Sequence, residues 1–169
     1  MAIWQDPKTG ALHDDADGEA LKLAAWPSGL TQLTAAQAAS AQAAVAQGYP
    51  WNGSSYMPPV PSLSQQAAAL LAGTVAISST STPMLDGSYT VTPDDQAHIS
   101  VEVQSLMLNG TFADGASTVA WPDASGTLHS FSVAEFKAFA TAVGGFVAAC
   151  LKCQNGASTT LPSAALTIA

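Results

Sequence analysis

Tryptophan, aspartate and histidine recur at matching spacing in two short segments of the chain. The segment "WQDPKTGALH" runs from Trp4 to His13, and "WPDASGTLH" runs from Trp121 to His129. Aspartate and histidine are common side chains for proton transfer and metal binding, so a doubled chemical site is one interpretation. A repeated hairpin turn is the other interpretation.

Turn chemistry accounts for most of this repeated motif. In the second copy we expect the carboxylate of Asp123 to cap backbone amides, Gly126 to adopt the left-handed conformation, and Trp121 to cover the core side of a small sheet. This assignment leaves only His13 and His129 without a structural role. We therefore predict a structural hairpin in each copy rather than a catalytic or metal site.

The two cysteines form a Cys-x-x-Cys pair, Cys150 and Cys153, a spacing found in redox and zinc sites. Two thiolates are only half of a zinc site, and the nearest histidine, His129, lies on the far side of an expected helix. At a helix C-terminus the helix dipole disfavours thiolate, whereas reactive cysteines favour helix N-termini. We predict small buried sulfurs at a helix end, with no metal and no cofactor.

An acidic stretch, Asp14 to Glu19, follows the first motif and invites comparison with a calcium loop. Placing Asp15 and Asp17 at the third and fifth loop positions puts His13 at the first and Ala24 where a bidentate glutamate is required. This mismatch excludes an EF-hand, while ion binding by this cluster or by the two motif histidines stays open.

The chain also has no nucleophile elbow, phosphate-binding loop, dinucleotide fingerprint or zinc-protease motif, so we predict no catalytic residue and a protein that is not an enzyme.

The composition makes several classes of partner unfavourable. Only 9% of the 169 residues are charged, the formal net charge is -8, and the sequence contains no arginine. Arginine is the residue that most often reads guanine edges and clamps phosphates, so nucleic acid is not an expected partner. Hydrophobic residues make up 48% of the chain, which together with the low charge suits a surface covered by other protein.

The sequence does not suggest a membrane protein. The N-terminus lacks the basic and apolar regions of a secretory signal. An apolar stretch near Ala138 to Leu151 is interrupted by Gly144 and Gly145 and is shorter than the roughly 20 residues that span a bilayer. We expect that the protein does not insert into a membrane and that it is synthesised in the cytoplasm.

The first part, residues 1–48, is predicted to be a β-hairpin followed by an alanine-rich helix. The hairpin strands are expected at 2–5 and 11–15, around the turn "DPKTG". The break "WPSG" at 26–29 precedes the helix, which should begin with a capping box between Thr34 and Gln37 and stop at Gly48.

Residues 49–64 are predicted to be a linker, because they contain proline and aromatic residues without any hydrophobic period. Its aromatic residues are the candidate interaction surface: Tyr49, Trp51 and Tyr56. These rings either dock a partner or anchor the linker to the body of the protein. We favour the interpretation that these rings anchor the linker.

The second part, residues 65–169, is predicted to be a small α+β domain, which makes the whole chain α+β. In order its elements are a short helix at 64–73, a strand at 74–80, a helix at about 93–109, hairpin strands at 117–121 and 127–131, a long helix capped by Ser132 and Glu135, and a final strand at 165–168. The long helix carries an apolar stripe with alternating spacings of three and four, formed by Phe136, Phe139, Val143, Phe146 and Cys150.

Four segments cover most of the chain outside the linker: "GALHDDADGEALKLAAWPSGLTQLTAAQA", "STSTPMLDGSYTVTPDDQAHI", "LNGTFADGASTVAWPDASGTLHSFSVAEFKAFATAVGGFVAAC" and "LPSAALTI". These segments resemble small proteins encoded by tailed bacteriophages and prophages. The latter three are similar to a domain of unknown function that recurs in tail-fibre assembly and tail-associated proteins. These are packing and turn motifs, and no catalytic residue is carried over from the family.

The resemblance implies a non-enzymatic structural or interaction protein of the virion tail, with the first part as its attachment element. Its partners would be other tail or tail-fibre proteins, and we expect a homo-oligomer. One alternative is a tail-fibre assembly chaperone. The other is a receptor-binding or carbohydrate-binding tail tip, in which Tyr49, Trp51 and Tyr56 stack on the ligand.

Overall fold

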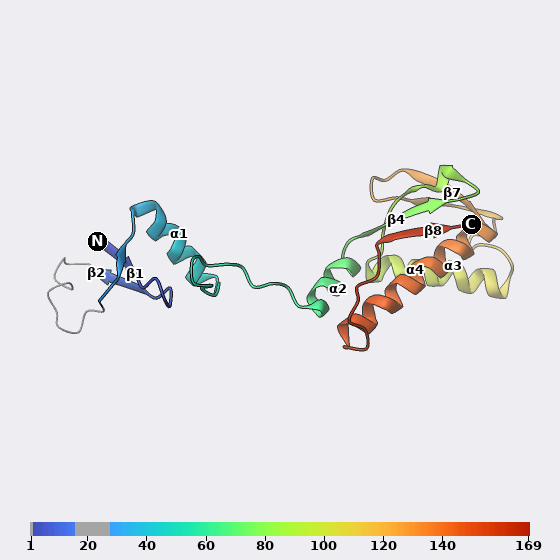
Figure 1. Cartoon of the computed structure of the whole chain (residues 1–169). Helices are drawn as coiled ribbons and strands as arrows, with labels where there is room; N and C mark the ends of the chain where they lie inside the picture. The colour runs from blue at the N-terminus through green and yellow to red at the C-terminus, as the bar shows by residue number, and fades with distance from the viewer. Residues whose placement is uncertain (1, 16–27) are drawn as a thin grey trace. The chain divides into compact units, whose positions relative to one another are not determined.

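The computed structural model describes residues 2–15 and 28–169, which fall into two units (Figure 1). Unit 1 ends at Val60 and unit 2 begins at Pro61, so the division lies inside the segment 49–64 that the sequence analysis assigns to a linker. Residues from Ala16 to Glu19 of the acidic cluster, and the start of the expected break at 26–29, lie outside the described residues.

The hairpin predicted in unit 1 is confirmed. Strand β1 (Ala2–Gln5) pairs antiparallel with β2 (Leu12–Asp15). A third strand, β3 (Thr31–Gln32), pairs with the other edge of β1 and gives the order β2-β1-β3. The sequence analysis missed β3, because two residues are too short to show an alternating pattern.

Helix α1 (Ala35–Ala46) follows, with the predicted ends. The hydroxyl of Thr34 accepts from the backbone N–H of Gln37, whose side-chain oxygen accepts from the N–H of Thr34 in return. At the other end Gly48 has a φ of +72°, and the N–H of Tyr49 donates to the carbonyl oxygen of Ala44. These bonds satisfy backbone groups that a helix leaves unpaired at its two ends.

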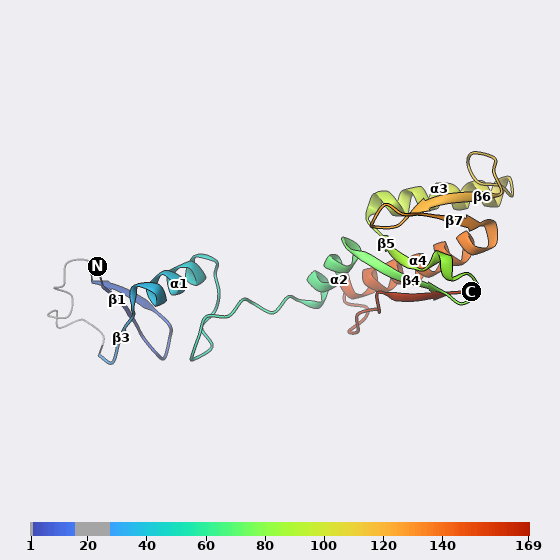
Figure 2. The same ribbon diagram turned by 90° about the horizontal axis from the view of Figure 1, so that it is seen from above.

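Unit 2 contains a mixed sheet and a separate hairpin, and the predicted α+β class is confirmed. Strand β4 (Thr74–Ser79) lies in the middle of the sheet, antiparallel to β5 (Gly87–Thr90) and parallel to β8 (Ala165–Ile168). Figure 2 shows β4 and β8 side by side. The sequence analysis missed β5, which follows a short 3-10 turn, η2 (Pro83–Leu85).

The second, two-stranded sheet is the predicted hairpin of β6 (Thr118–Pro122) and β7 (Leu128–Ser132). Three helices complete the unit: α2 (Leu63–Leu71), α3 (Pro93–Leu108) and α4 (Val133–Gln154). Each starts with a capping box, and the strands lie to one side of α3 and α4 (Figure 1). The short helix starts earlier than predicted, because Ser62 rather than a later residue caps it.

The core of unit 2 is an aromatic cluster on the buried side of α4. The predicted stripe is confirmed, since all five of its residues are buried. The ring of Phe139 has its centroid 5.1 Å from Tyr89, 5.3 Å from Phe131 and 5.7 Å from Phe136. Tilted and edge-to-face pairs such as these stabilise a core beyond the effect of buried area alone.

Among the described residues, α4 is also the one helix whose length and apolar composition are enough to cross a membrane. Its Gly144 and Gly145 are helical, so the glycine pair that interrupts the apolar stretch does not interrupt the helix, which is 22 residues long. The stripe from Phe136 to Cys150 lies in the core of unit 2, which is a sufficient reason for the apolar composition on that side.

We predict that Phe139→Ala lowers the free energy of unfolding of unit 2 by about 3–5 kcal/mol, because it removes a fully buried ring that contacts several others. Leu108→Ala, at a side chain that is 83% exposed, should change it by less than about 0.5 kcal/mol. Urea unfolding of the two variants, followed by near-ultraviolet circular dichroism, measures both values. Equal losses would contradict the placement of the core.

Candidate functional site

The doubled motif forms the same structure twice. In the first hairpin Trp4 lies directly opposite His13, and in the second Trp121 lies opposite His129. The intervening aspartate begins the turn in both copies and accepts hydrogen bonds from turn residues. The motif is therefore a repeated way of closing a hairpin, as the turn chemistry predicts.

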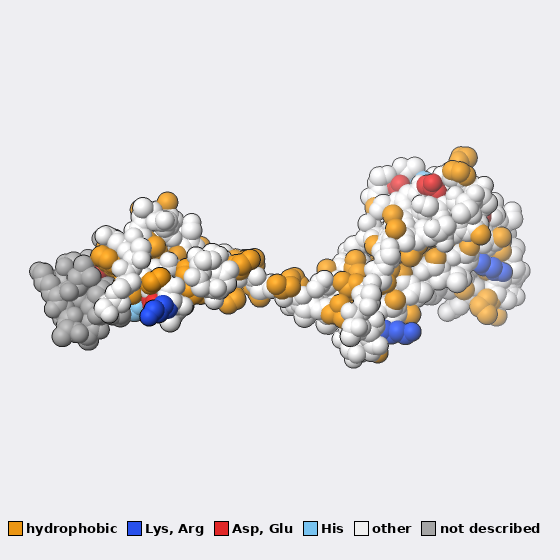
Figure 3. Space-filling view, viewed as in Figure 1, with side chains coloured by type: hydrophobic (Ala, Val, Ile, Leu, Met, Phe, Trp, Pro, Cys, Tyr) orange, Lys and Arg blue, Asp and Glu red, His pale blue; other side chains and the backbone are white. Residues whose placement is uncertain are grey.

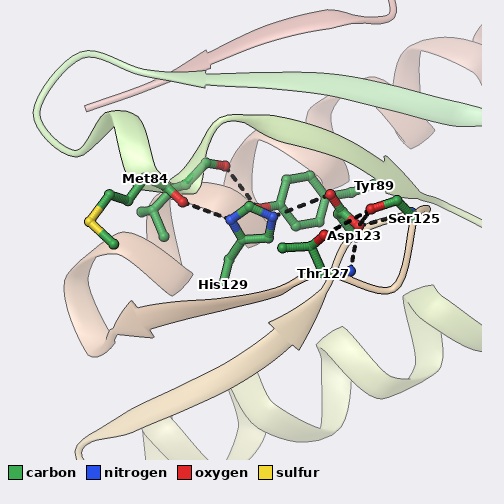
Figure 4. A network of polar contacts seen from close by, with 7 residues as sticks. Met84, Tyr89, Asp123, Ser125, Thr127 and His129 are labelled. Atoms are coloured by element: carbon green, nitrogen blue, oxygen red, sulfur yellow. Dashed lines mark hydrogen bonds and ion pairs between the residues drawn. The ribbon is translucent and has the colours of Figure 1, made fainter.

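The second copy also carries a polar network (Figure 4). One carboxylate oxygen of Asp123 accepts from the backbone N–H groups of Ser125 and Thr127 at 2.8 and 2.9 Å, and from the Ser125 hydroxyl at 2.7 Å. The other oxygen lies 3.3 Å from Nε2 of His129. The hydroxyl of Ser125, followed by the amide of Thr127 and the ring of His129, lowers the pKa of Asp123 to about 2.

His129 has a structural role, which corrects the expectation from the sequence. Its Nδ1 lies 2.7 Å from the carbonyl oxygen of Met84, which only accepts, so Nδ1 carries the hydrogen. A protonated ring donates to both Met84 and Asp123, whereas a neutral ring donates only to Met84. The equivalent histidine of the first hairpin, His13, is not free either.

This network fastens the hairpin to β5 and to the segment that precedes it. Besides the contact between His129 and Met84, the N–H of Ala124 donates to the carbonyl oxygen of Ser88 at 2.7 Å. The hydroxyl of Tyr89 donates to the carbonyl oxygen of Leu85, and burial, followed by the charge of Asp123, raises the pKa of Tyr89 to about 12. Tyr89 therefore stays a neutral hydroxyl, and the network joins the hairpin to η2 and β5.

The Cys-x-x-Cys pair behaves as the structural interpretation predicts. Cys150 and Cys153 are free, buried and close to the C-terminal end of α4. Burial, and then the neighbouring Cys153, raises the pKa of Cys150 above its ordinary value, and the thiol of Cys153 donates to the carbonyl oxygen of Thr160. Over residues 2–15 and 28–169, no three His, Cys, Asp or Glu side chains are grouped so as to hold a metal ion.

Two of the three predicted aromatic residues come together in unit 1. The rings of Trp51 and Tyr56 pack edge to face with centroids 5.1 Å apart, and their backbones form an isolated β-bridge. Nε1 of Trp51 donates to the carbonyl oxygen of Pro7, and the hydroxyl of Tyr56 donates to that of Gly10. Part of the expected linker is thus anchored to the β1–β2 hairpin.

These rings line a groove of about 470 Å³ between the sheet, α1 and the turn at 52–55, which we call the aromatic groove. Its other lining side chains are small or neutral: Gln5, Leu33, Ala36, Gln37, Ser40, Ala41, Ala44, Ser54 and Ser55. Asn52 shapes the turn, since its side-chain oxygen accepts from the N–H groups of Ser54 and Ser55 at 2.9 Å. Among residues 2–15 and 28–169, no charged side chain lines this groove.

Tyr49, the third aromatic residue of the predicted interaction surface, is not among the residues that line the aromatic groove. The sequence analysis missed the polar residues of α1 that line it, because it treated the helix as a packing surface alone. The signal was the spacing of Gln37, Ser40 and Ala44, which places the three on one helical face.

Unit 2 has a second, more apolar groove of about 650 Å³ between α3 and α4, which we call the helix groove. Its apolar lining includes Ile99, Val103, Met107, Val143 and Val147, and Lys137 is the one charged residue that lines it among the residues that the structure describes. Met107 and its neighbour Leu108 are 79% and 83% exposed. Figure 3 shows hydrophobic side chains spread over the visible surface, with few charged ones between them.

Comparison with protein families gives a match over the second part of the chain. A family model described as "Domain of unknown function (DUF4376)" matches residues 64–169, from α2 to the end of the chain. Comparison with curated proteins and with solved structures finds no match.

We predict that Gly10→Ala displaces Trp51 from the hairpin. Gly10 has a φ of +75°, and a Cβ there would lie 2.5 Å from Cγ of Trp51. Gly48→Ala is the matched control, because Gly48 has a φ of +72° and nothing within 4 Å of an added Cβ. Both variants should lose about 1–2 kcal/mol from backbone strain. Only Gly10→Ala should shift the indole N–H resonance of Trp51 in a nitrogen-15 spectrum, and an unchanged resonance would refute the contact.

Proposed function

We propose that this chain, which belongs to the DUF4376 family through residues 64–169, is a non-enzymatic structural and interaction protein of a bacteriophage tail. Other tail or tail-fibre proteins are its partners in this proposal, and the assembled virion is its location. The tail assignment rests on the resemblance in sequence described above.

The observation that carries an interaction role is the exposed apolar surface of unit 2. Met107 projects from α3 at the helix groove and is 79% exposed. Leu108 and Val101 on the same helix do not line that groove but are 83% and 54% exposed. Exposed large apolar side chains beside a groove are typical of surfaces that other proteins cover. The net charge of -8 favours a protein partner over a nucleic acid.

The polar side chains support a non-enzymatic role. The carboxylate of Asp123 and the ring of His129 are engaged with turn amides and a carbonyl oxygen. Glu135 likewise accepts from the hydroxyls of Thr82 and Ser132, which lowers its pKa, with the bond from Thr82 as the largest cause. These groups hold elements of unit 2 together, and that use explains their conformations without any reaction.

The assembly-chaperone alternative makes a different prediction about where the protein is found. A chaperone raises the soluble yield of a co-expressed tail fibre and is absent from finished particles. A tail component is present in particles at a fixed ratio to other tail proteins.

We predict that mass spectrometry of purified particles detects the protein at a fixed ratio to the other tail proteins. Met107→Glu should lower its content in particles about tenfold or more, because a buried unpaired charge at an interface costs several kcal/mol. Met84→Glu is the matched control, since Met84 is 85% exposed and does not line the helix groove. Absence of the wild-type protein from particles would overturn the proposal.

A further inference from the structure

We propose that the aromatic groove of unit 1 binds a neutral saccharide, with Trp51 and Tyr56 as its stacking residues. This inference goes beyond the proposed function, because a structural role in the tail requires no small ligand. It also stands on a different unit, since the whole groove lies within residues 1–60.

The two rings are held in place by their own polar atoms. The indole N–H of Trp51 and the hydroxyl of Tyr56 both donate to carbonyl oxygens of the β1–β2 turn. The rings therefore offer the groove mainly their hydrocarbon surface, in a fixed edge-to-face arrangement with a 63° angle between planes. A pyranose ring has an apolar C–H face that packs well on such a surface.

The polar lining is suited to hydroxyl groups. Carboxamides and serine hydroxyls both donate and accept, as sugar hydroxyls do. The side-chain oxygen of Gln37 is already bonded at the helix cap, which leaves its NH₂ group as a donor. The hydroxyl of Ser54 donates to Asn52, which leaves its oxygen as an acceptor.

The lack of charge in the lining selects among ligand classes. In the part of the chain that the structure describes, the residues that line the aromatic groove include no Lys, Asp, Glu or His, and the whole chain has a net charge of -8. An anionic ligand would find no cation there to replace its hydration, so phosphates and acidic sugars are disfavoured. A neutral sugar loses only hydroxyl hydration, which the amide and hydroxyl side chains replace.

The size and rigidity of the groove are also appropriate. Its volume of about 470 Å³ is within the range of small-molecule sites, roughly 300–1,000 Å³. Small side chains on α1, including Ala41 and Ala44, leave room above the helix, and the capped helix and the Asn52 turn fix the two walls. A site already formed before binding spends little free energy on ordering.

The test is a titration of the full-length, nitrogen-15-labelled protein with glucose, galactose, N-acetylglucosamine, N-acetylgalactosamine and their neutral disaccharides. The indole N–H resonance of Trp51, assigned by its loss in Trp51→Phe, is the readout. We expect saturable shifts with at least one neutral sugar, at a dissociation constant of about 1 mM, and none with glucuronate.

Ser40→Glu places a charge in the groove from an exposed helical position and should weaken binding about tenfold or more. Ala39→Glu, one residue away on the same helix and outside the lining, should leave binding within about twofold of the wild type. The proposal fails if no neutral sugar shifts the Trp51 resonance, or if Ser40→Glu leaves the affinity for the neutral sugar unchanged. It also fails if glucuronate or an unrelated peptide binds with the same affinity as the neutral sugar. Detection of the protein in particles tests the tail role separately.

Discussion

Unit 2 depends on the burial of the aromatic rings along α4. Phe136 and Phe139 are fully buried and contact Trp121 and Phe131 from the β6–β7 hairpin and Tyr89 from β5. The hairpin and the mixed sheet share no strand pairing, so this cluster is what brings them onto one core. Ring pairs with defined angles also fix the orientation of the hairpin, which a core of alanines would not do.

The polar side chains complete that arrangement. A polar contact attaches the segment around η2 to the hairpin. His129 of the hairpin bonds to the carbonyl oxygen of Met84 in η2. Glu135 does the same at the start of α4 through the hydroxyl of Thr82. Residues that resemble catalytic groups in the sequence are thus used to join elements of unit 2.

The sequence was informative where local rules decide the structure. Capping boxes located the starts of α1 and α4, and the spacing of Phe136, Phe139 and Val143 identified the core. It failed where a distant contact decides. β3 and β5 are short strands that exist because β1 and β4 offer them an edge. The bond from His129 to Met84 spans 45 residues, and the attachment of Trp51 to Pro7 spans 44, so no local pattern marks them.

The claim that the Asp123 and His129 network serves the fold, while function resides in binding surfaces, is tested most directly with Asp123→Asn. The measurement is the free energy of unfolding of the wild type and the variant from pH 7 to pH 2, together with the content of each protein in particles. The pKa of Asp123 is lowered from 3.8 to about 2, so its contribution is present above pH 4 and is lost as the pH falls toward 2. We predict a less stable variant at pH 7, convergence of the two curves at acid pH, and unchanged content in particles at temperatures where the variant is folded. Equal stability at every pH, combined with loss from particles, would contradict the account.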